Sequence, residues 1–163
     1  MSVLRGDWPL EMRGGRAVGL ALQDQAGALL EASSVPRMEK NAKELRQTAL
    51  DIRKLLVGPV MADTSLQLAP SVPDPESRRM ELADLAVDVI TAADYLLSLL
   101  ETPRSPAPRL VLDAGVDSYR GSGLADSDLM DRLNRRRLDA RSTVVRLGMR
   151  LLGALYSDIA ADN

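Results

Sequence analysis

Apolar residues recur at alternating intervals of four and three residues through one stretch of the chain. They are Met38, Ala42, Leu45, Ala49, Ile52 and Leu56. This spacing places all of them on one side of an α-helix, so it predicts a helix over 36–57 that packs lengthwise against other helices. Pro36 suits the first turn of that helix, where its missing N–H costs nothing, and Gly58-Pro59 ends it.

A longer helix is expected over 75–101. Asp74 is a good N-cap, Pro75 fits the first helical position, and Thr102-Pro103 ends the segment. Its inner positions are Leu82, Leu85, Val89, Ala93, Leu96 and Leu100, widened by Ala86, Ile90 and Leu97. A face this wide predicts a central helix that is contacted on more than one side.

Two further helices are expected near the ends of the chain. The first covers 12–32, and the last follows a cap at Asp126 or Ser127 and reaches about Ile159. The inner positions are Val18, Leu22, Ala26 and Leu29 in the first helix, and Leu133, Ala140, Val144, Leu147, Leu151 and Leu155 in the last. Leu- and Ala-rich stripes of this kind are typical of helix-on-helix packing.

The fold class that follows is all-α, an antiparallel bundle of about four main helices with two long irregular connections. The chain of 163 residues is treated as one domain, with an N-terminal arm over 1–11, a Pro-rich linker over 58–74 and a Pro/Gly-rich loop over 103–125. There is no Phe and aromatic residues total 2%, which favours a bundle over a sandwich or barrel.

The chain has no signal-peptide pattern and no apolar run near the roughly 20 residues that cross a bilayer. We therefore expect a cytoplasmic protein without a membrane partner. The formal net charge of −2 gives no bulk argument for nucleic acid. The absence of His and Cys excludes Ser–His, Cys–His and cysteine-zinc chemistry, which leaves carboxylates, Lys, Arg and Tyr.

Three acids border the apolar face of the third helix, namely Glu81, Asp84 and Asp88. Carboxylates this close repel one another unless a cation lies between them. Acids spaced as in Glu81-Leu82-Ala83-Asp84 can present two oxygen donors to Mg²⁺. The simpler interpretation is that they are solvated or paired with Arg78, Arg79 or arginines of the last helix.

The stretch Glu81-Leu82-Ala83-Asp84, followed by a long apolar helix, resembles the ExxD helix of the MazG-like all-α nucleotide pyrophosphohydrolases. Upstream, LQDQAGALLEA over 22–32 is similar to that family's LQEEVGELAEA pattern, with Asp24 and Glu31 at acid positions. Gln25 and Ala28 stand where the family has acids. The resemblance implies Mg²⁺-dependent hydrolysis of nucleoside triphosphates, with Asp24, Glu31, Glu81, Asp84 and Asp88 around the metal.

An arginine run, DRLNRRRLDAR over 131–141, lies in the last helix. Arg135 and Arg136 fall on a side that also carries acids, so a nucleic-acid backbone is a less favoured partner than solvent and ion pairs. Arg137 and Arg141 point toward the apolar side, where a charge must be paired. We expect them to pair with Glu81, Asp84 or Asp88; the alternatives are that they reach water at a helix end, or that they bind a phosphate or a partner's carboxylate.

Three functions remain after these arguments. The favoured one is a non-catalytic helical assembly or interaction protein that self-associates and needs no cofactor, because the acid set is incomplete and the third helix has surplus apolar surface. The alternatives are a divergent MazG-like pyrophosphohydrolase that uses Mg²⁺, and a helical subunit that binds nucleic-acid backbone.

Overall fold

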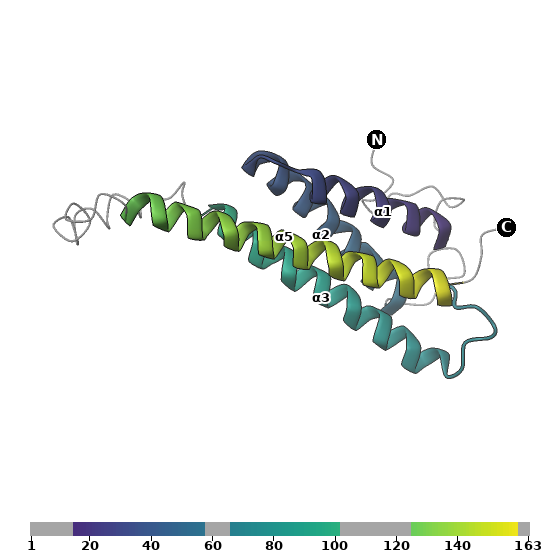
Figure 1. Cartoon of the computed structure of the whole chain (residues 1–163). Helices are drawn as coiled ribbons and strands as arrows, with labels where there is room; N and C mark the ends of the chain where they lie inside the picture. Colours follow the sequence, from purple (N-terminus) through teal and green to yellow (C-terminus); the bar gives the residue numbers. More distant parts are fainter. Residues whose placement is uncertain (1–14, 58–65, 102–124, 160–163) are drawn as a thin grey trace.

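The computed structural model describes residues 15–57, 66–101 and 125–159, which form four helices packed side by side (Figure 1). These are α1 (Gly15–Glu31), α2 (Val35–Val57), α3 (Pro75–Glu101) and α5 (Ala125–Asp158). The all-α bundle expected from the sequence is confirmed. The N-terminal arm, residues 58–65 of the linker and residues 102–124 lie outside the described residues.

Each helix packs on two neighbours, in the cyclic order α1, α2, α3, α5 and back to α1. Neighbours run antiparallel. Between α1 and α5, for example, Gly19 lies beside Tyr156 at one end, and Arg141 contacts the carbonyl of Ala32 at the other. α1 and α3 therefore occupy opposite corners of the bundle. This arrangement decides which functional side chains can meet.

The core consists of the apolar stripes. All six members of the repeat on α2 are buried, as are the four inner positions of α1. On α3, Ala86 is also buried, and Ile90 and Leu97 are partly buried against the core. The wide apolar face of α3 is thus covered by α2 and α5 within the same chain.

The helix ends are fixed by local hydrogen bonds. The backbone N–H of Arg37 donates to Ser34 Oγ at 3.4 Å at the start of α2, and the N–H of Ser77 donates to Asp74 Oδ1 at 3.5 Å at the start of α3. Asp74 has a φ of 48°, a left-handed conformation that Asp tolerates better than most residues. The predicted cap at Asp74 is confirmed, whereas α5 begins at Ala125, before its predicted cap.

The described part of the linker is tied to the bundle. Leu66 is fully buried and its N–H donates to the carbonyl of Leu55 at 3.2 Å. Leu68 forms an isolated antiparallel bridge with Ile159, and the N–H of Ala69 donates to the carbonyl of Asp158 at 2.7 Å. These contacts fasten the segment before α3 to the end of α5.

α5 has 34 residues and is about 51 Å long at ~1.5 Å per residue, against about 40 Å for the 27 residues of α3. Its N-terminal end extends beyond the other helices, and Leu129 and Met130 are exposed there (Figure 1). Within the described ranges, no helix combines the length and apolar character that a membrane span requires.

Candidate functional site

The acids predicted to surround a metal lie on two separate helices. Asp24 and Glu31 are exposed on α1, and Glu81, Asp84 and Asp88 are exposed on α3. Because α1 and α3 occupy opposite corners, the core separates the two groups within one chain. In the part of the chain that the structure describes, no group of three His, Cys, Asp or Glu side chains could hold a metal ion.

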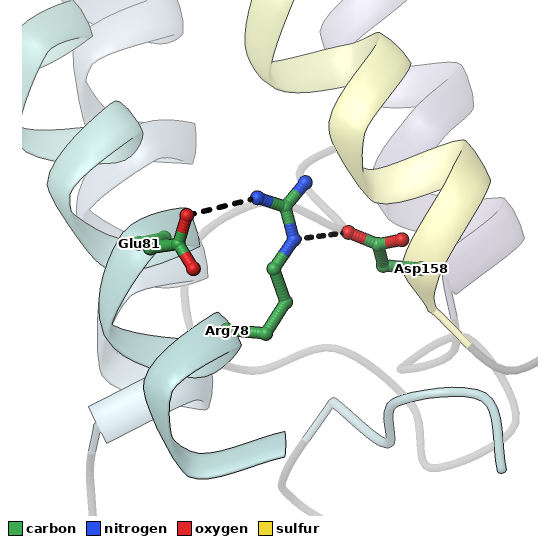
Figure 2. A network of polar contacts seen from close by, with 3 residues as sticks. All are labelled: Arg78, Glu81 and Asp158. Carbon is green, nitrogen blue, oxygen red and sulfur yellow. Dashed lines mark hydrogen bonds and ion pairs between the residues drawn. The ribbon is translucent and has the colours of Figure 1, made fainter. Parts of the chain in front are cut away.

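The acids of α3 are connected to α5 through Arg78. Its Nη1 lies 3.4 Å from Glu81 Oε2, and its Nε donates to Asp158 Oδ2 at the end of α5 (Figure 2). The hydrogen bond that Arg78 donates to Asp158 is the main reason that the pKa of Arg78 is raised above its ordinary value. The predicted pairing of these acids with Arg78 is therefore confirmed for Glu81.

Arg137 is the one buried arginine side chain among the described residues, with 5% of its surface exposed. Its Nε donates to the carbonyl of Leu99 at 3.2 Å, and its Nη1 donates to Asn134 Oδ1 at 3.2 Å. Leu99 is in the last turn of α3, eleven residues beyond Asp88, which corresponds to about 16 Å along the axis at ~1.5 Å per residue. The expectation that Arg137 pairs with Glu81, Asp84 or Asp88 is thus wrong.

Arg141 is likewise directed at backbone rather than at the predicted acids. Its Nη1 donates to the carbonyl of Ala32, immediately after α1, at 2.8 Å. The last carbonyls of a helix have no partner within the helix and carry its negative end, so a guanidinium stabilises them. Arg79 does the same for the carbonyl of Leu56 in the last turn of α2, at 3.0 Å, and it also donates to the carbonyl of Leu66 in the segment before α3. These three arginines fasten the ends of α1, α2 and α3.

Arg135 and Arg136 are exposed on the outer side of α5. Nearby, Arg132 forms an ion pair of 3.1 Å with Asp128 one turn earlier, and Asp139 is also exposed. Arg136, Asp139 and Tyr95 line a small depression of about 330 Å³ between α3 and α5, together with Ala92, Ala140 and Thr143. Acids therefore dilute the positive charge on this side, as the sequence indicated.

A polar layer is buried between α1 and α2. Thr48 is fully buried, and its hydroxyl lies 2.6 Å from Gln25 Oε1 and 3.1 Å from the carbonyl of Glu44. Gln25 Nε2 is buried without a hydrogen-bond partner. Sequence reasoning missed this layer, although a polar residue directly beside a seam position, as Thr48 is beside Ala49, could have signalled it.

Asp51 lies one turn further along α2 and is also buried. Gln47 Nε2 donates to its Oδ1 at 3.0 Å, while its Oδ2 has no hydrogen-bond partner. Removal from water disfavours the charged form, so burial raises the pKa of Asp51, with Gln47 and Lys54 acting in the opposite direction. It is the one carboxyl among the described residues with a resolved upward pKa shift.

A groove of about 690 Å³ lies between α1 and α5, and we call it the α1–α5 groove. It is lined by Gln23, Asp24, Ala26, Gly27, Ala28, Leu30, Glu31, Val145 and Met149. Leu30 is 51% exposed and Met149 is 45% exposed. The groove therefore combines small residues, exposed apolar side chains and two of the predicted acids. These features are better suited to binding a helix of another chain than to binding a small charged ligand.

The fold and this surface define the chain as an all-α bundle whose neighbouring helices are antiparallel. No family model matches the chain, and the searches of curated proteins and of solved structures gave no match.

Proposed function

We propose that this protein is a non-catalytic assembly protein that self-associates through the apolar surface of its helices. The α1–α5 groove carries this proposal, because its exposed leucine and methionine side chains line a concave surface between two long helices. Contiguous apolar surface of this kind is characteristic of sites that bind another protein.

The support for self-association comes from α1 and α5, whereas the sequence suggested the apolar surface of α3. The surplus apolar positions of α3 are used inside the chain, with Ala86 buried and Ile90 and Leu97 packed on the core. α3 still exposes Met80, Val87 and Tyr95, whereas several exposed apolar side chains of α1 and α5 line the groove or lie on the same helix faces. These side chains of α1 and α5 are Leu20, Leu30, Leu138, Met149 and Tyr156.

The oligomeric state tests the proposal. Sedimentation equilibrium or light scattering, from one micromolar to tens of micromolar, is expected to give a mass of about twice the 17.7 kDa of one chain. The fraction of the larger species should rise with concentration. A mass of one chain throughout that range would overturn the proposal.

The catalytic alternative is tested with the same preparation. A MazG-like enzyme would release pyrophosphate from a nucleoside triphosphate when Mg²⁺ is added, and Asp84→Ala would abolish the release. We expect no release from any of a panel of nucleoside triphosphates, since Asp24 and Glu31 are on a different corner of the bundle from Asp84. Release that depends on Asp84 would show that the protein is an enzyme.

The nucleic-acid alternative predicts salt-sensitive binding to oligonucleotides. Replacing Arg135 and Arg136 by alanine would weaken such binding. We expect no retention of single- or double-stranded oligonucleotides at physiological salt, because Asp128 and Asp139 share the outer side of α5 with these arginines. Retention that the double variant removes would contradict the proposal.

A further inference from the structure

We infer that the second copy occupies the α1–α5 groove, and that a two-fold axis parallel to the helices packs α1 of each copy against α5 of the other. This inference rests on the proposed function and specifies the surface and the symmetry of the association. Four observations support this inference. Small residues and apolar residues occur along the groove, charges of opposite sign lie on its two sides, and those charges lie at matching levels along the bundle axis.

Small residues allow a second helix to come close. A Cβ added at Gly27 or Gly153 would meet nothing within 4 Å, so neither glycine is required by packing within the described part of the chain. Glycine in a helix interior is less favourable than alanine. A close contact with another chain gives a physical reason for tolerating it at exposed positions on both helices.

Apolar side chains extend the groove along both helices. Leu20 precedes Gly27 by seven residues, and Leu138 precedes Val145 by seven. Tyr156 follows Met149 by the same interval. Because seven residues return a helix to nearly the same face, Leu20, Leu138 and Tyr156 continue the surface that the groove begins. Leu20 and Tyr156 therefore extend the apolar surface toward the start of α1, and Leu138 lies on α5 just beyond the end of α1.

Charges of opposite sign flank the groove on its two helices. Asp24 and Glu31 line it on the α1 side, whereas Arg146 and Arg150, which follow the lining residues Val145 and Met149 in the sequence, are exposed on α5 outside that lining. Within the described ranges, none of these four charged side chains forms an ion pair. A surface with one acidic and one basic side is complementary to itself, which makes a second copy a better occupant than a chain of uniform charge.

The height of the charges along the bundle selects the symmetry. Gly19 lies beside Tyr156, and Ala32 lies beside Arg141, which fixes the alignment of the antiparallel helices α1 and α5. In this alignment Asp24 lies at the same level along the bundle axis as Arg150. Glu31 lies within about one turn of Arg146. A two-fold axis parallel to the helices keeps these levels and places each α1 over the α5 of the other copy. Asp24 then faces Arg150 of the partner subunit, and Glu31 approaches Arg146 of the partner subunit.

The other face-to-face arrangement is less favourable. A two-fold axis across the helices, in the plane of the interface, would place α1 on α1 and α5 on α5. Acids would then meet acids and arginines would meet arginines, which opposes association. The parallel axis is therefore the symmetry that the charges support.

Charge reversal tests the pairing. Asp24→Arg alone and Arg150→Asp alone are each expected to raise the dimer dissociation constant by at least about tenfold, since like charges would face each other twice per dimer. The double variant with both changes should recover association. Asp84→Arg, an equivalent change on the exposed side of α3, is the matched control and should leave dimerisation unchanged. Circular dichroism checks that each variant keeps its helices.

Mixing the two single variants gives a second, sharper test. A dimer of one Asp24→Arg copy and one Arg150→Asp copy would contain one reversed pair and one native pair, so association should return on mixing. If the wild-type chain is dimeric and these variants behave like it, the inferred interface is wrong while the proposed function stands. If the wild-type chain is monomeric, both are wrong.

Discussion

Arg141 of α5 donates a hydrogen bond of 2.8 Å to the backbone carbonyl of Ala32, although 109 residues separate them in the chain. The bond joins the last helix to the corner between the first two. It provides a donor for a carbonyl at the negative end of α1, where the helix itself has none.

Replacing Arg141 by alanine is expected to destabilise the protein by roughly 1–3 kcal/mol, because the change removes a charge-assisted hydrogen bond and the packing of the side-chain stem. Urea unfolding followed by circular dichroism measures the change. Arg135→Ala is the control, since Arg135 is exposed on the same helix, and it should alter stability by less than about 0.5 kcal/mol. Equal effects of the two changes would contradict this role for Arg141.

The Thr48–Gln25 contact is expected to behave as a coupled pair. Thr48→Val leaves the buried amide of Gln25 without its contact and should cost about 1–3 kcal/mol, the penalty for an unsatisfied buried polar group. Gln25→Met added to Thr48→Val should recover much of that loss, because both polar partners are then absent. A double-mutant cycle from urea unfolding gives the coupling energy, and additive effects would show that the two side chains do not interact.

The raised pKa of the buried Asp51 carboxyl predicts that the stability of the protein depends on pH. The pKa of Asp51 in the folded protein is raised above the ordinary value of 3.8, so between those two pKa values the folded state binds more protons than the unfolded state. The contribution of Asp51 to stability is therefore greatest at low pH and falls as the pH rises through this interval.

Asp51→Asn should remove this dependence while keeping an oxygen that accepts the hydrogen bond from Gln47. We expect the variant to be more stable than the wild type at neutral pH, by about 1 kcal/mol, because a neutral amide costs less to bury than a carboxylate. The difference should close below pH ~4, where the carboxyl is protonated in both states. Thermal unfolding as a function of pH measures it, with Asp94→Asn at an exposed ion pair as control.

The substitution Gly27→Ala tests whether Gly27 is needed for the stability of the single folded chain, apart from any role in association. The added Cβ meets nothing within 4 Å, so the folded single chain should gain about 0.5–1 kcal/mol from the better helix former. In dilute solution the variant is expected to melt at a higher temperature than the wild type. A lower melting temperature there would mean that Gly27 has a contact outside the described residues.

The helices were predictable because each one depends on a pattern that the sequence displays. The repeat from Met38 to Leu56 alternates over several turns, and all of its members are buried. Asp74 and Pro75 mark the start of α3 by well-understood capping chemistry. Periodicity and capping depend on residues close together in the chain, so a single sequence is enough to detect them.

The partners of Arg137 and Arg141 were not predictable in the same way. Both side chains bind backbone carbonyls, and every residue has a carbonyl, so no residue type identifies the acceptor. The separation of Asp24 from Asp84 depends on which helices are diagonal in the bundle, which periodicity does not reveal. The groove also follows from this arrangement, because it exists only where α1 and α5 meet.

Gly19 near the beginning of α1 lies against the ring of Tyr156 near the end of α5, so the start of α1 and the end of α5 lie at the same end of the bundle (Figure 1). A short peptide could therefore join the two ends, and the chain could be opened between Glu101 and Ala125 instead. Such a circular permutant would keep every helix contact while changing the order in which the helices are synthesised. The bundle is, in this sense, a closed ring of helices whose starting point is arbitrary.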